Sequence, residues 1–443
     1  MLKTAIICLF CCGALLVMPA IAAAGALLDL PELEALTLDH SPLIKQAYAG
    51  RDAARARVTQ ARSGFWPWLG GQANIRNNRN SANNTESRQS EEAGLNLSQT
   101  LFDYSLWFGS KSAGLQSLAF DEDVRVVHNN VLTQVRQAYF AVRIAEKLLE
   151  VAGEAQKDTE AFRDKVGMML ASGLVPQLDL ARAEYDLAEA TRKVIEAKAS
   201  LRKQFARLAL TVGLDQVYGA SLNGEVVARE QVFSLSEEEL LDMALKFRPE
   251  IKRFDYLAQA SEAAIEQARG GHFPVLSFQG NWGRFGQHRL DQEAHNYGLY
   301  LDVPLFQGFR VEGFVGEYQA LHRLALQELA QMRLNAREQT HVAYQDLQET
   351  LAKVEVSQNQ VSTAEENWRL MESRYQAGLA TPLELSEART NRFSAIAQLA
   401  SDRIMVLSAL AALDRAAGGA LFPFAHQRQD SFTYQYQNSG FEP

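Results

Sequence analysis

Two long stretches of the chain place apolar residues at helical spacing. In the first, consecutive apolar positions are three or four residues apart, close to the 3.5-residue period of a coiled coil. These positions are Val124, Val127, Val131, Val135, Ala138, Val142, Ala145, Leu149 and Ala152. The pattern predicts a helix from about Ser105 to Leu170. A second long helix is predicted from about Val311 to Gln376.

Shorter helical patterns flank each long one. In the first half they cover residues 30–62 and 177–212. In the second half they cover residues 236–269, with an interruption near Pro249, and the residues from the 377–382 turn to about Ala416. In each half the two shorter helices together match the long one in length. We therefore predict that they lie end to end beside it, in a rod on the order of 100 Å long at 1.5 Å per residue.

Segments of alternating polarity interrupt the helical pattern twice. Residues 68–78 and 93–102 alternate around a polar loop, and residues 275–285 and 297–306 do the same. Strands of about ten residues around a polar loop are typical of a membrane β-hairpin. The sequence predicts β-hairpins over 67–102 and 274–306. The face toward lipid is expected to carry Leu95, Leu97, Leu299 and Leu301.

The change from helix to strand occurs twice with nearly the same residues, QARSGFWP at 60–67 and QARGGHFP at 267–274. Other matches keep the same order, so we infer a twofold internal repeat. The junctions are expected to act as swivels at Gly64, Pro67, Gly271 and Pro274. The predicted organisation is a signal peptide over 1–24, a first repeat over 25–213 with a turn at 171–176, a connector over 214–235, a second repeat over 236–416 with a turn at 377–382, and a tail over 417–443.

Residues 1–24 have the composition of a secretory signal peptide. Lys3 is followed by an uncharged apolar run from Ala5 to Met18, and then by small residues that fit an A-x-A cleavage site. The run is too short for a transmembrane anchor, which needs about 20 apolar residues. All three cysteines lie in this segment, so the exported chain is expected to have no disulfide and no cysteine metal site.

The net charge of −9 gives no support to nucleic-acid binding. After Ala26 we find no apolar run that approaches the length of a membrane-spanning helix. An exported chain that enters a membrane is then expected to do so as a closed β-barrel. Four strands are too few to close, because open edges in lipid leave backbone groups unpaired. Several copies of the chain would have to contribute strands to one barrel.

Candidate chemistry is weak along the whole chain. The eight histidines include His288 and His295 near a predicted loop, but none has the spacing of a zinc motif. We expect no catalytic residue, no cofactor and no metal ion. An enzyme is the least favoured interpretation of the sequence.

Several motifs, in their doubled order, resemble the TolC family of outer-membrane efflux proteins. They are the strand-opening prolines, GLNLSQTLF at 94–102, YLDVPLF at 300–306, and above all RYQAG at 374–378 leading to ELSEA at 384–388. The resemblance implies a mainly α-helical protein with membrane β-strands. Three copies would form a 12-stranded β-barrel that an α-helical tunnel of coiled coils continues across the periplasm. The connector and the tail would form an equatorial domain.

The same resemblance implies a passive exit duct in the outer membrane, in contact with outer-membrane lipid and with a long periplasmic portion. A periplasmic adaptor protein and an inner-membrane transporter would be its partners in a tripartite efflux system. Because the transporter would choose the cargo, type I protein secretion stays open beside small-molecule efflux. A periplasmic coiled-coil scaffold with soluble hairpins is the alternative from another class, and the apolar strand faces count against it.

Acidic residues after the second turn are candidates for a periplasmic entrance. Glu384 and Glu387 match positions where family members place acidic rings, and Asp179 is the first-repeat counterpart of Glu384. Three copies of each carboxylate would attract cations. The alternative is an ordinary helix start, where acidic side chains interact well with the helix dipole.

The two turns are candidates for contact with an adaptor. An exposed apolar tip is otherwise a liability, which favours a partner over simple packing of the turn. The residues are Gly173, Leu174, Val175, Gly378, Leu379 and Ala380.

Aromatic residues gather at the ends of the predicted strands. They fit either an interfacial belt at the membrane boundary or a core between barrel and helices. The residues are Trp66, Trp68, Phe102, Trp282, Tyr297 and Phe306.

Overall fold

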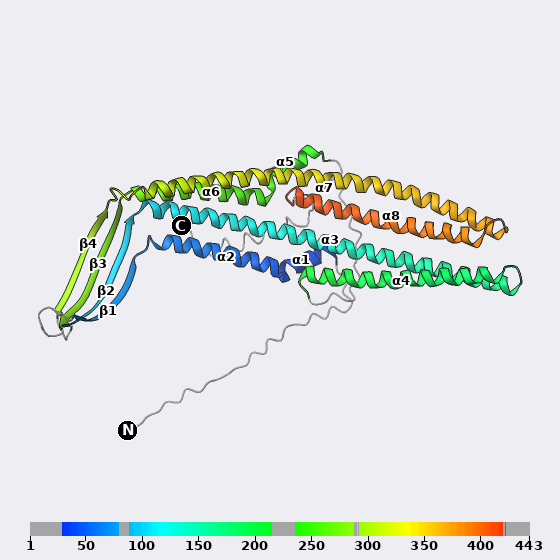
Figure 1. Ribbon diagram of the computed structural model, residues 1–443, viewed down its shortest axis with the longest axis horizontal. Coiled ribbons are helices and arrows are strands. Elements are labelled where there is room, and N and C mark those ends of the chain that lie inside the picture. Colours follow the sequence, from blue (N-terminus) through cyan, green and yellow to red (C-terminus); the bar gives the residue numbers. More distant parts are fainter. Residues whose placement is uncertain are drawn as a thin grey trace, which may run out of the picture.

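A computed structural model describes residues 29–78, 88–214, 235–287, 290, 292–419 and 421. The chain forms a long rod of helices with all four strands at one end and two helix turns at the other (Figure 1). The predicted signal peptide, most of the connector and nearly all of the tail lie outside the described residues. The expectations about cleavage and about an equatorial domain therefore stay predictions.

The first repeat has one long helix with shorter helices beside it (Figure 1). Helix α3 runs over Tyr104–Ala171, and its first turn is capped by the Asp103 carboxylate, which accepts a hydrogen bond from the backbone N–H of Leu106. The shorter helices are α1 (Leu30–His40), α2 (Pro42–Ser63) and α4 (Gln177–Val212). The prediction of one unbroken helix from residue 30 to 62 is wrong. Proline disfavours helical geometry in the residue before it, so α1 ends before Ser41.

The second repeat has the same arrangement. The long helix α7 runs over Arg310–Gln376, and α5 (Glu237–Phe247), α6 (Pro249–Arg269) and α8 (Pro382–Ala416) lie along it (Figure 1). The break between α5 and α6 falls at Arg248, again directly before a proline. The fold class read from the apolar spacing, with long paired helices and a small strand contribution, is confirmed.

The strands form one antiparallel sheet in the order β1-β2-β3-β4, so the two hairpins pair with each other through β2 and β3. Three predicted strand ends are wrong, because β4 also begins earlier, at Gln292 and not at residue 297. β2 begins well inside the polar stretch assigned to a loop, because backbone pairing continues beyond the apolar positions. β4 ends before Pro304, which cannot donate a ladder hydrogen bond, and not at Phe306. The strands are β1 (Trp68–Asn78), β2 (Arg88–Phe102), β3 (Val275–Gln287) and β4 (Gln292–Asp302).

The register separates an apolar face of the sheet from a polar one. Leu97 pairs with Leu69 and with Gly280, and Phe278 pairs with Leu299, so these side chains share one face. The other face carries hydrogen-bonded polar side chains. The Asn96 amide donates to Gln72 Oε1 at 2.9 Å, and the Gln72 amide donates to Glu92 Oε1 at 3.4 Å.

The main core lies where α1, α3, α4 and α8 meet, near the middle of the rod (Figure 1). Its buried residues are Leu30, Leu33, Val135, Tyr139, Phe140, Val142, Leu208, Val212 and Ala411. Val135 and Val142 of this core, and the buried residues Val124, Val131 and Ala145 of α3, belong to the apolar stripe predicted from the sequence. The coiled-coil spacing therefore corresponds to the face that α3 turns toward its neighbours.

A buried ionic cluster beside this core joins the two repeats. Arg136 of α3 donates from Nε to Glu34 Oε1 of α1 at 2.6 Å and from Nη1 to Asp414 Oδ2 of α8 at 2.7 Å. The three side chains are 2%, 8% and 3% exposed. Asp414 Oδ1 also accepts the backbone N–H of Leu421, which anchors the start of the tail.

The apolar composition of helix α8 contradicts the prediction that no apolar run of membrane-spanning length follows Ala26. It contains the single stretch, among the described helices, that is long and apolar enough to cross a membrane by length and composition. The expectation that no such run follows Ala26 is therefore wrong. The helix packs along α7 instead, with Leu410 and Leu413 buried between them.

Candidate channel entrance and membrane junction

The two helix turns at the free end of the rod have the same backbone geometry. Gly173 and Gly378 have φ values of 70° and 71°, in the left-handed region that favours glycine. The backbone N–H groups of Leu174 and Leu379 reach back to the carbonyls of Met169 and Arg374 at 2.9 and 2.8 Å. These hydrogen bonds satisfy the last carbonyls of α3 and α7, so each turn is short and rigid.

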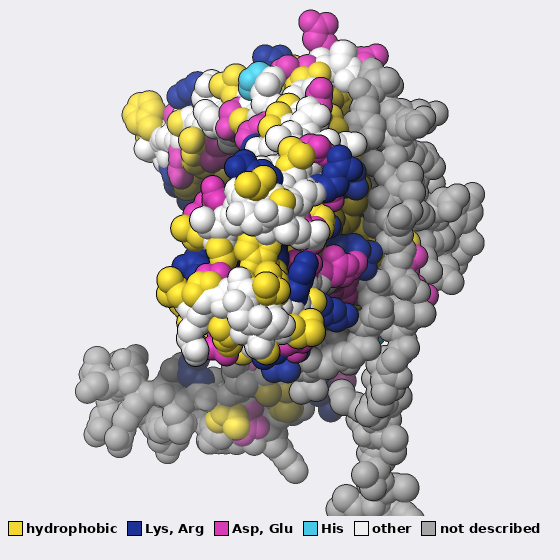
Figure 2. Space-filling model, turned by 90° about the vertical axis from the view of Figure 1, so that its right-hand side faces the viewer, with side chains coloured by type: hydrophobic (Ala, Val, Ile, Leu, Met, Phe, Trp, Pro, Cys, Tyr) yellow, Lys and Arg dark blue, Asp and Glu magenta, His cyan; other side chains and the backbone are white. Residues whose placement is uncertain are grey.

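The apolar turn residues divide into two groups. Leu174 and Leu379 are 71% and 69% exposed. Val175 and Ala380 instead pack against a buried cluster that includes Tyr375, so they are used for the packing of the turn. Figure 2 faces this end of the rod and shows hydrophobic side chains exposed on it.

Glu384 occupies the third position of α8 and takes part in a capping box. Its Oε2 accepts the Thr381 backbone N–H at 2.7 Å, while Thr381 Oγ1 accepts the backbone N–H of Glu384 at 3.3 Å. The backbone and then the side-chain hydrogen bond from Thr381 lower the pKa of Glu384. The helix-start role that the sequence left open is thus present, and the carboxylate stays ionised.

The other two acidic candidates differ in exposure. Glu387 lies about one turn after Glu384 and is also exposed, so the two share one side of α8. Asp179, in the first turn of α4, is only partly exposed. Burial, followed by the nearby Asp179 charge, raises the pKa of Tyr375 at the end of α7. Asp179 therefore lies between the helix pairs of the two repeats.

Sequence reasoning missed Arg389, which links the repeats close to the tip. This buried side chain of α8 lies with Nε 2.8 Å from Asp158 Oδ2 of α3, and its guanidinium carbon is 4.2 Å from the Phe162 ring centre. Burial lowers the pKa of Arg389, and the Asp158 charge opposes that shift. The available signal was its spacing: Arg389 comes four residues after Leu385, on the buried stripe of α8.

At the other end, the junction glycines allow close packing of the helices. Gly64 has an ordinary helical φ of −63°, but an added Cβ would lie 2.7 Å from Leu106 Cδ1. A Cβ at Gly271 would lie 2.8 Å from Val311 Cγ2. Gly270, which the sequence did not single out, is tighter, since a Cβ there would lie 2.6 Å from the backbone nitrogen of Ser105. Space against the next helix, rather than backbone rotation, explains these glycines.

Each of the two predicted prolines lies directly before the strand that it was expected to open. Pro67 precedes β1 and Pro274 precedes β3. The aromatic residues around the junction and strands are exposed in the single chain, so they do not belong to a core within it. Their exposed fractions are 73% for Trp66, 61% for Trp68, 49% for Phe102, 43% for Trp282, 67% for Tyr297 and 75% for Phe306.

Within the described part of the chain, no group of three or more His, Cys, Asp or Glu side chains could hold a metal ion. His341 contacts Glu237, with Nδ1 and Oε1 2.5 Å apart, and His322 lies 2.9 Å from the Ser261 hydroxyl. His295 is in β4, and His288 is outside the described residues. The acidic residues at the tip do not form a coordination site within one chain.

A rod of paired helices that ends in a sheet with one apolar face is the arrangement expected of an outer-membrane channel protein. The sequence model of the family described as "Outer membrane efflux protein" matches residues 34–214 and 240–419, which fall in the two repeats. The chain belongs to this family, as its motifs predicted, and its place is the outer membrane.

Known relatives match the chain along most of their length. The chain is 26% identical to "Outer membrane protein TolC" of Salmonella enteritidis, over 83% of this chain and 77% of that protein. It is 25% identical to "Alkaline protease secretion protein AprF" of Pseudomonas aeruginosa, over 86% and 83%. The crystal structure of VceC from Vibrio cholerae superposes with a TM-score of 0.77 at 20% identity, covering 89% of this chain and 97% of that one.

Proposed function

We propose that three copies of this chain assemble into a passive exit duct, through which substrates leave the periplasmic side and cross the outer membrane. The observation that carries the proposal is the sheet with two free edges. In the order β1-β2-β3-β4, the outer sides of β1 and β4 have no strand beside them in the described chain. In lipid such edges leave backbone groups unpaired, so β4 of one copy would pair with β1 of the next.

Three copies supply twelve strands, enough to close a barrel with an open lumen. The apolar face with Leu97 and Leu299 would then meet lipid. The polar face with Gln72 and Asn96 would line the lumen. The long helices would continue the barrel as a tunnel, because α2, α3, α6 and α7 leave the sheet side by side (Figure 1).

The assembly predicts an oligomer that survives detergent. The protein is expected in the outer-membrane fraction and, without heating, to migrate on SDS gels at about three times its 49.2 kDa chain mass, collapsing to the monomer after boiling. Reconstituted in planar bilayers, it should form a conducting pore. Recovery as a soluble periplasmic monomer would instead support the coiled-coil scaffold.

The duct would depend on partners for energy and for choice of cargo. A periplasmic adaptor and an inner-membrane transporter fit the long periplasmic rod. Efflux is the main function proposed, in accord with the family's description, and type I protein secretion is the alternative, since one relative is named for protease secretion. The walls of such a duct need no catalytic group, so we propose no enzymatic activity.

The exposed leucines of the two turns are proposed to contact the adaptor. A photoreactive amino acid at Leu379 should crosslink in whole cells to a periplasmic adaptor, identified by mass spectrometry. The same probe at Val175, which packs inward, should not. If Leu379 crosslinks only to other copies of this chain, the turns serve packing at the tip and not recognition of a partner.

The carboxylates of Glu384 and Glu387 are proposed to form rings at the periplasmic entrance, with Asp179 nearby. Support comes from their exposure, from their shared side of α8, and from the hydrogen bonds that keep Glu384 ionised. Three copies would place six of these carboxylates around one opening. A cation passing there would be attracted strongly.

A further inference from the structure

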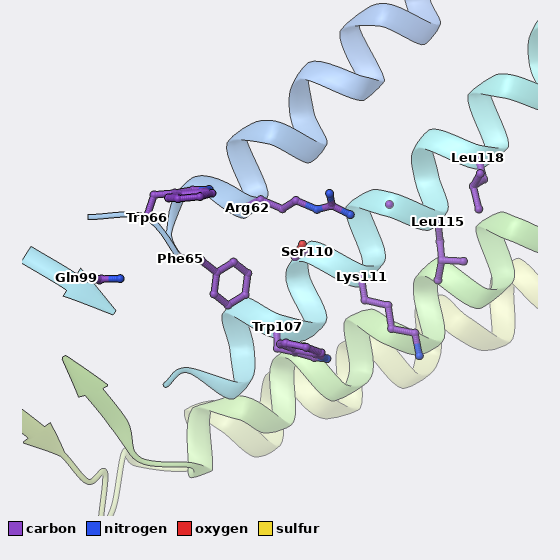
Figure 3. Close-up of a pocket in the computed structure, with 10 residues that line it drawn as sticks. Arg62, Phe65, Trp66, Gln99, Trp107, Ser110, Lys111, Leu115 and Leu118 are labelled. Carbon is purple, nitrogen blue, oxygen red and sulfur yellow. The ribbon is translucent and has the colours of Figure 1, made fainter. Parts of the chain in front are cut away.

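A groove opens between α2 and α3 where these helices meet the sheet (Figure 3). Its volume is about 850 Å³, within the range of small-molecule sites. Figure 3 shows Trp66 and Arg62 coming from the end of α2, and Trp107 and Lys111 from the first turns of α3. The remaining lining residues are Phe65, Gln99, Ser110, Gly114, Leu115 and Leu118.

The position of Gln99 relates the groove to the membrane. Gln99 pairs with Phe278, which pairs with Leu299, so it lies on the apolar face of the sheet. It is also near the end of β2 that joins α3. The groove therefore begins where the lipid-facing surface ends, at the periplasmic boundary of the outer membrane.

The lining carries two positive charges and no acidic residue. Neither Arg62 nor Lys111 has a carboxylate within ion-pair distance among the described residues. Lys111 Nζ lies 5.7 Å from the centre of the Phe108 ring. Two cations without a carboxylate partner, beside an apolar floor, complement an anionic headgroup attached to acyl chains.

The aromatic and aliphatic side chains provide the apolar part of such a site. Trp66 and Trp107 are 73% and 65% exposed, and tryptophan favours the headgroup level of a bilayer. The Phe65 ring meets the Trp107 ring edge-on, with centroids 6.3 Å apart, and closes the groove toward the strands. Leu115 and Leu118 continue the apolar floor along α3.

Gly114 keeps the groove open. A Cβ added there would meet no atom within 4 Å, although glycine inside a helix costs about 0.5–1 kcal/mol relative to alanine. Gly114 lines the groove, and any larger side chain at this position would enter it.

We infer that this groove binds one anionic glycerophospholipid of the periplasmic leaflet, with its headgroup attracted by the positive charges of Arg62 and Lys111 and its acyl chains beside the two tryptophans. The inference rests on the outer-membrane location of the chain but not on its transport role. A lipid held there would fix the height of the helix-to-strand junction relative to the bilayer.

The test uses the detergent-purified, delipidated full-length protein, titrated with short-chain phosphatidylglycerol and followed by native mass spectrometry. One phosphatidylglycerol per chain is expected to bind, more tightly than phosphatidylcholine of the same chain length. Arg62→Gln with Lys111→Gln should weaken phosphatidylglycerol binding about 30-fold, since each of the two cations near an anionic lipid contributes about 1 kcal/mol. Lys157→Gln with Arg202→Gln removes the same charge from exposed sites elsewhere and should leave binding unchanged.

A second pair of variants tests whether a large side chain that fills the groove prevents lipid binding. Gly114→Phe should abolish the bound lipid, whereas Gly153→Phe, at another open glycine of α3, should not. Equal binding of both phospholipids would overturn the anionic specificity. Inorganic phosphate that competes fully would show a free-anion site and not a lipid site. A folded oligomer without bound lipid, or Gly114→Phe behaving as Gly153→Phe, would refute the inference while leaving the exit duct intact.

Discussion

Replacing Arg136 with methionine is expected to destabilise the chain by about 3–5 kcal/mol, the usual cost of breaking a buried ion pair from one side. The substitution leaves the Glu34 and Asp414 carboxylates buried and without their shared cation. Both would have to be desolvated without compensation. The measurement is denaturant unfolding of the detergent-solubilised protein, followed by helical circular dichroism.

Two further variants separate the buried cluster from a general effect of losing an arginine. Arg192 pairs with Glu189 and Glu196 on its own exposed helix surface, so Arg192→Met should leave the unfolding midpoint nearly unchanged. The triple variant Glu34→Gln, Arg136→Met, Asp414→Asn removes all the charges and should recover much of the stability. If Arg136→Met and Arg192→Met shift the midpoint equally, the cluster does not hold the repeats together.

Neutralising both acidic candidates at the start of α8 is expected to weaken block of the pore by a trivalent cation by about tenfold or more, because a ring of carboxylates concentrates cations at an opening. The variants are Glu384→Gln and Glu387→Gln, since glutamine keeps the capping box with Thr381. Block would be measured as single-channel conductance in planar bilayers, with cation added on the periplasmic side. Glu154→Gln, at an exposed position of α3, is the matched control.

The pH dependence of block tests the capping of Glu384. Hydrogen bonds from Thr381 lower the pKa of Glu384, so its carboxylate stays charged to a lower pH than an ordinary glutamate. A Glu387→Gln pore, which keeps Glu384, should therefore keep its block to a lower pH than the same pore with Thr381→Val. Thr381→Val should move the Glu384 midpoint upward. Unchanged block in the double variant would remove both residues from the entrance and leave the fold unaffected.

Much of the fold follows from local patterns. The stripe from Val124 to Ala152 predicts a long helix because a helix can bury apolar residues only at its own period. The helices break before both Pro42 and Pro249, but only the break near Pro249 was predicted from the sequence. The first was missed because the surrounding alanines and arginines favour helix strongly, while the constraint that proline places on Ser41 acts on a single residue.

Other features depend on which residues meet across the fold. Arg389 looks like a surface cation in sequence, and only the approach of Asp158 and Phe162 from α3 makes it a buried link. Strand ends escaped prediction for a related reason. Backbone pairing extends β2 through residues whose side chains are polar, because a ladder hydrogen bond does not depend on the side chain.

The junctions at QARSGFWP and QARGGHFP show most clearly which features follow from local sequence and which follow from packing. The two changes from helix to strand follow from local residues, since glycine and proline together stop a helix. The need for the glycines follows from packing, because the space at Gly64, Gly270 and Gly271 is limited by Leu106, Ser105 and Val311 on other helices. Packing also brings Arg62 and Lys111, which are far apart in the chain, to one groove at the membrane boundary. Spacing along a chain encodes local conformation, whereas distances between helices arise only once they pack.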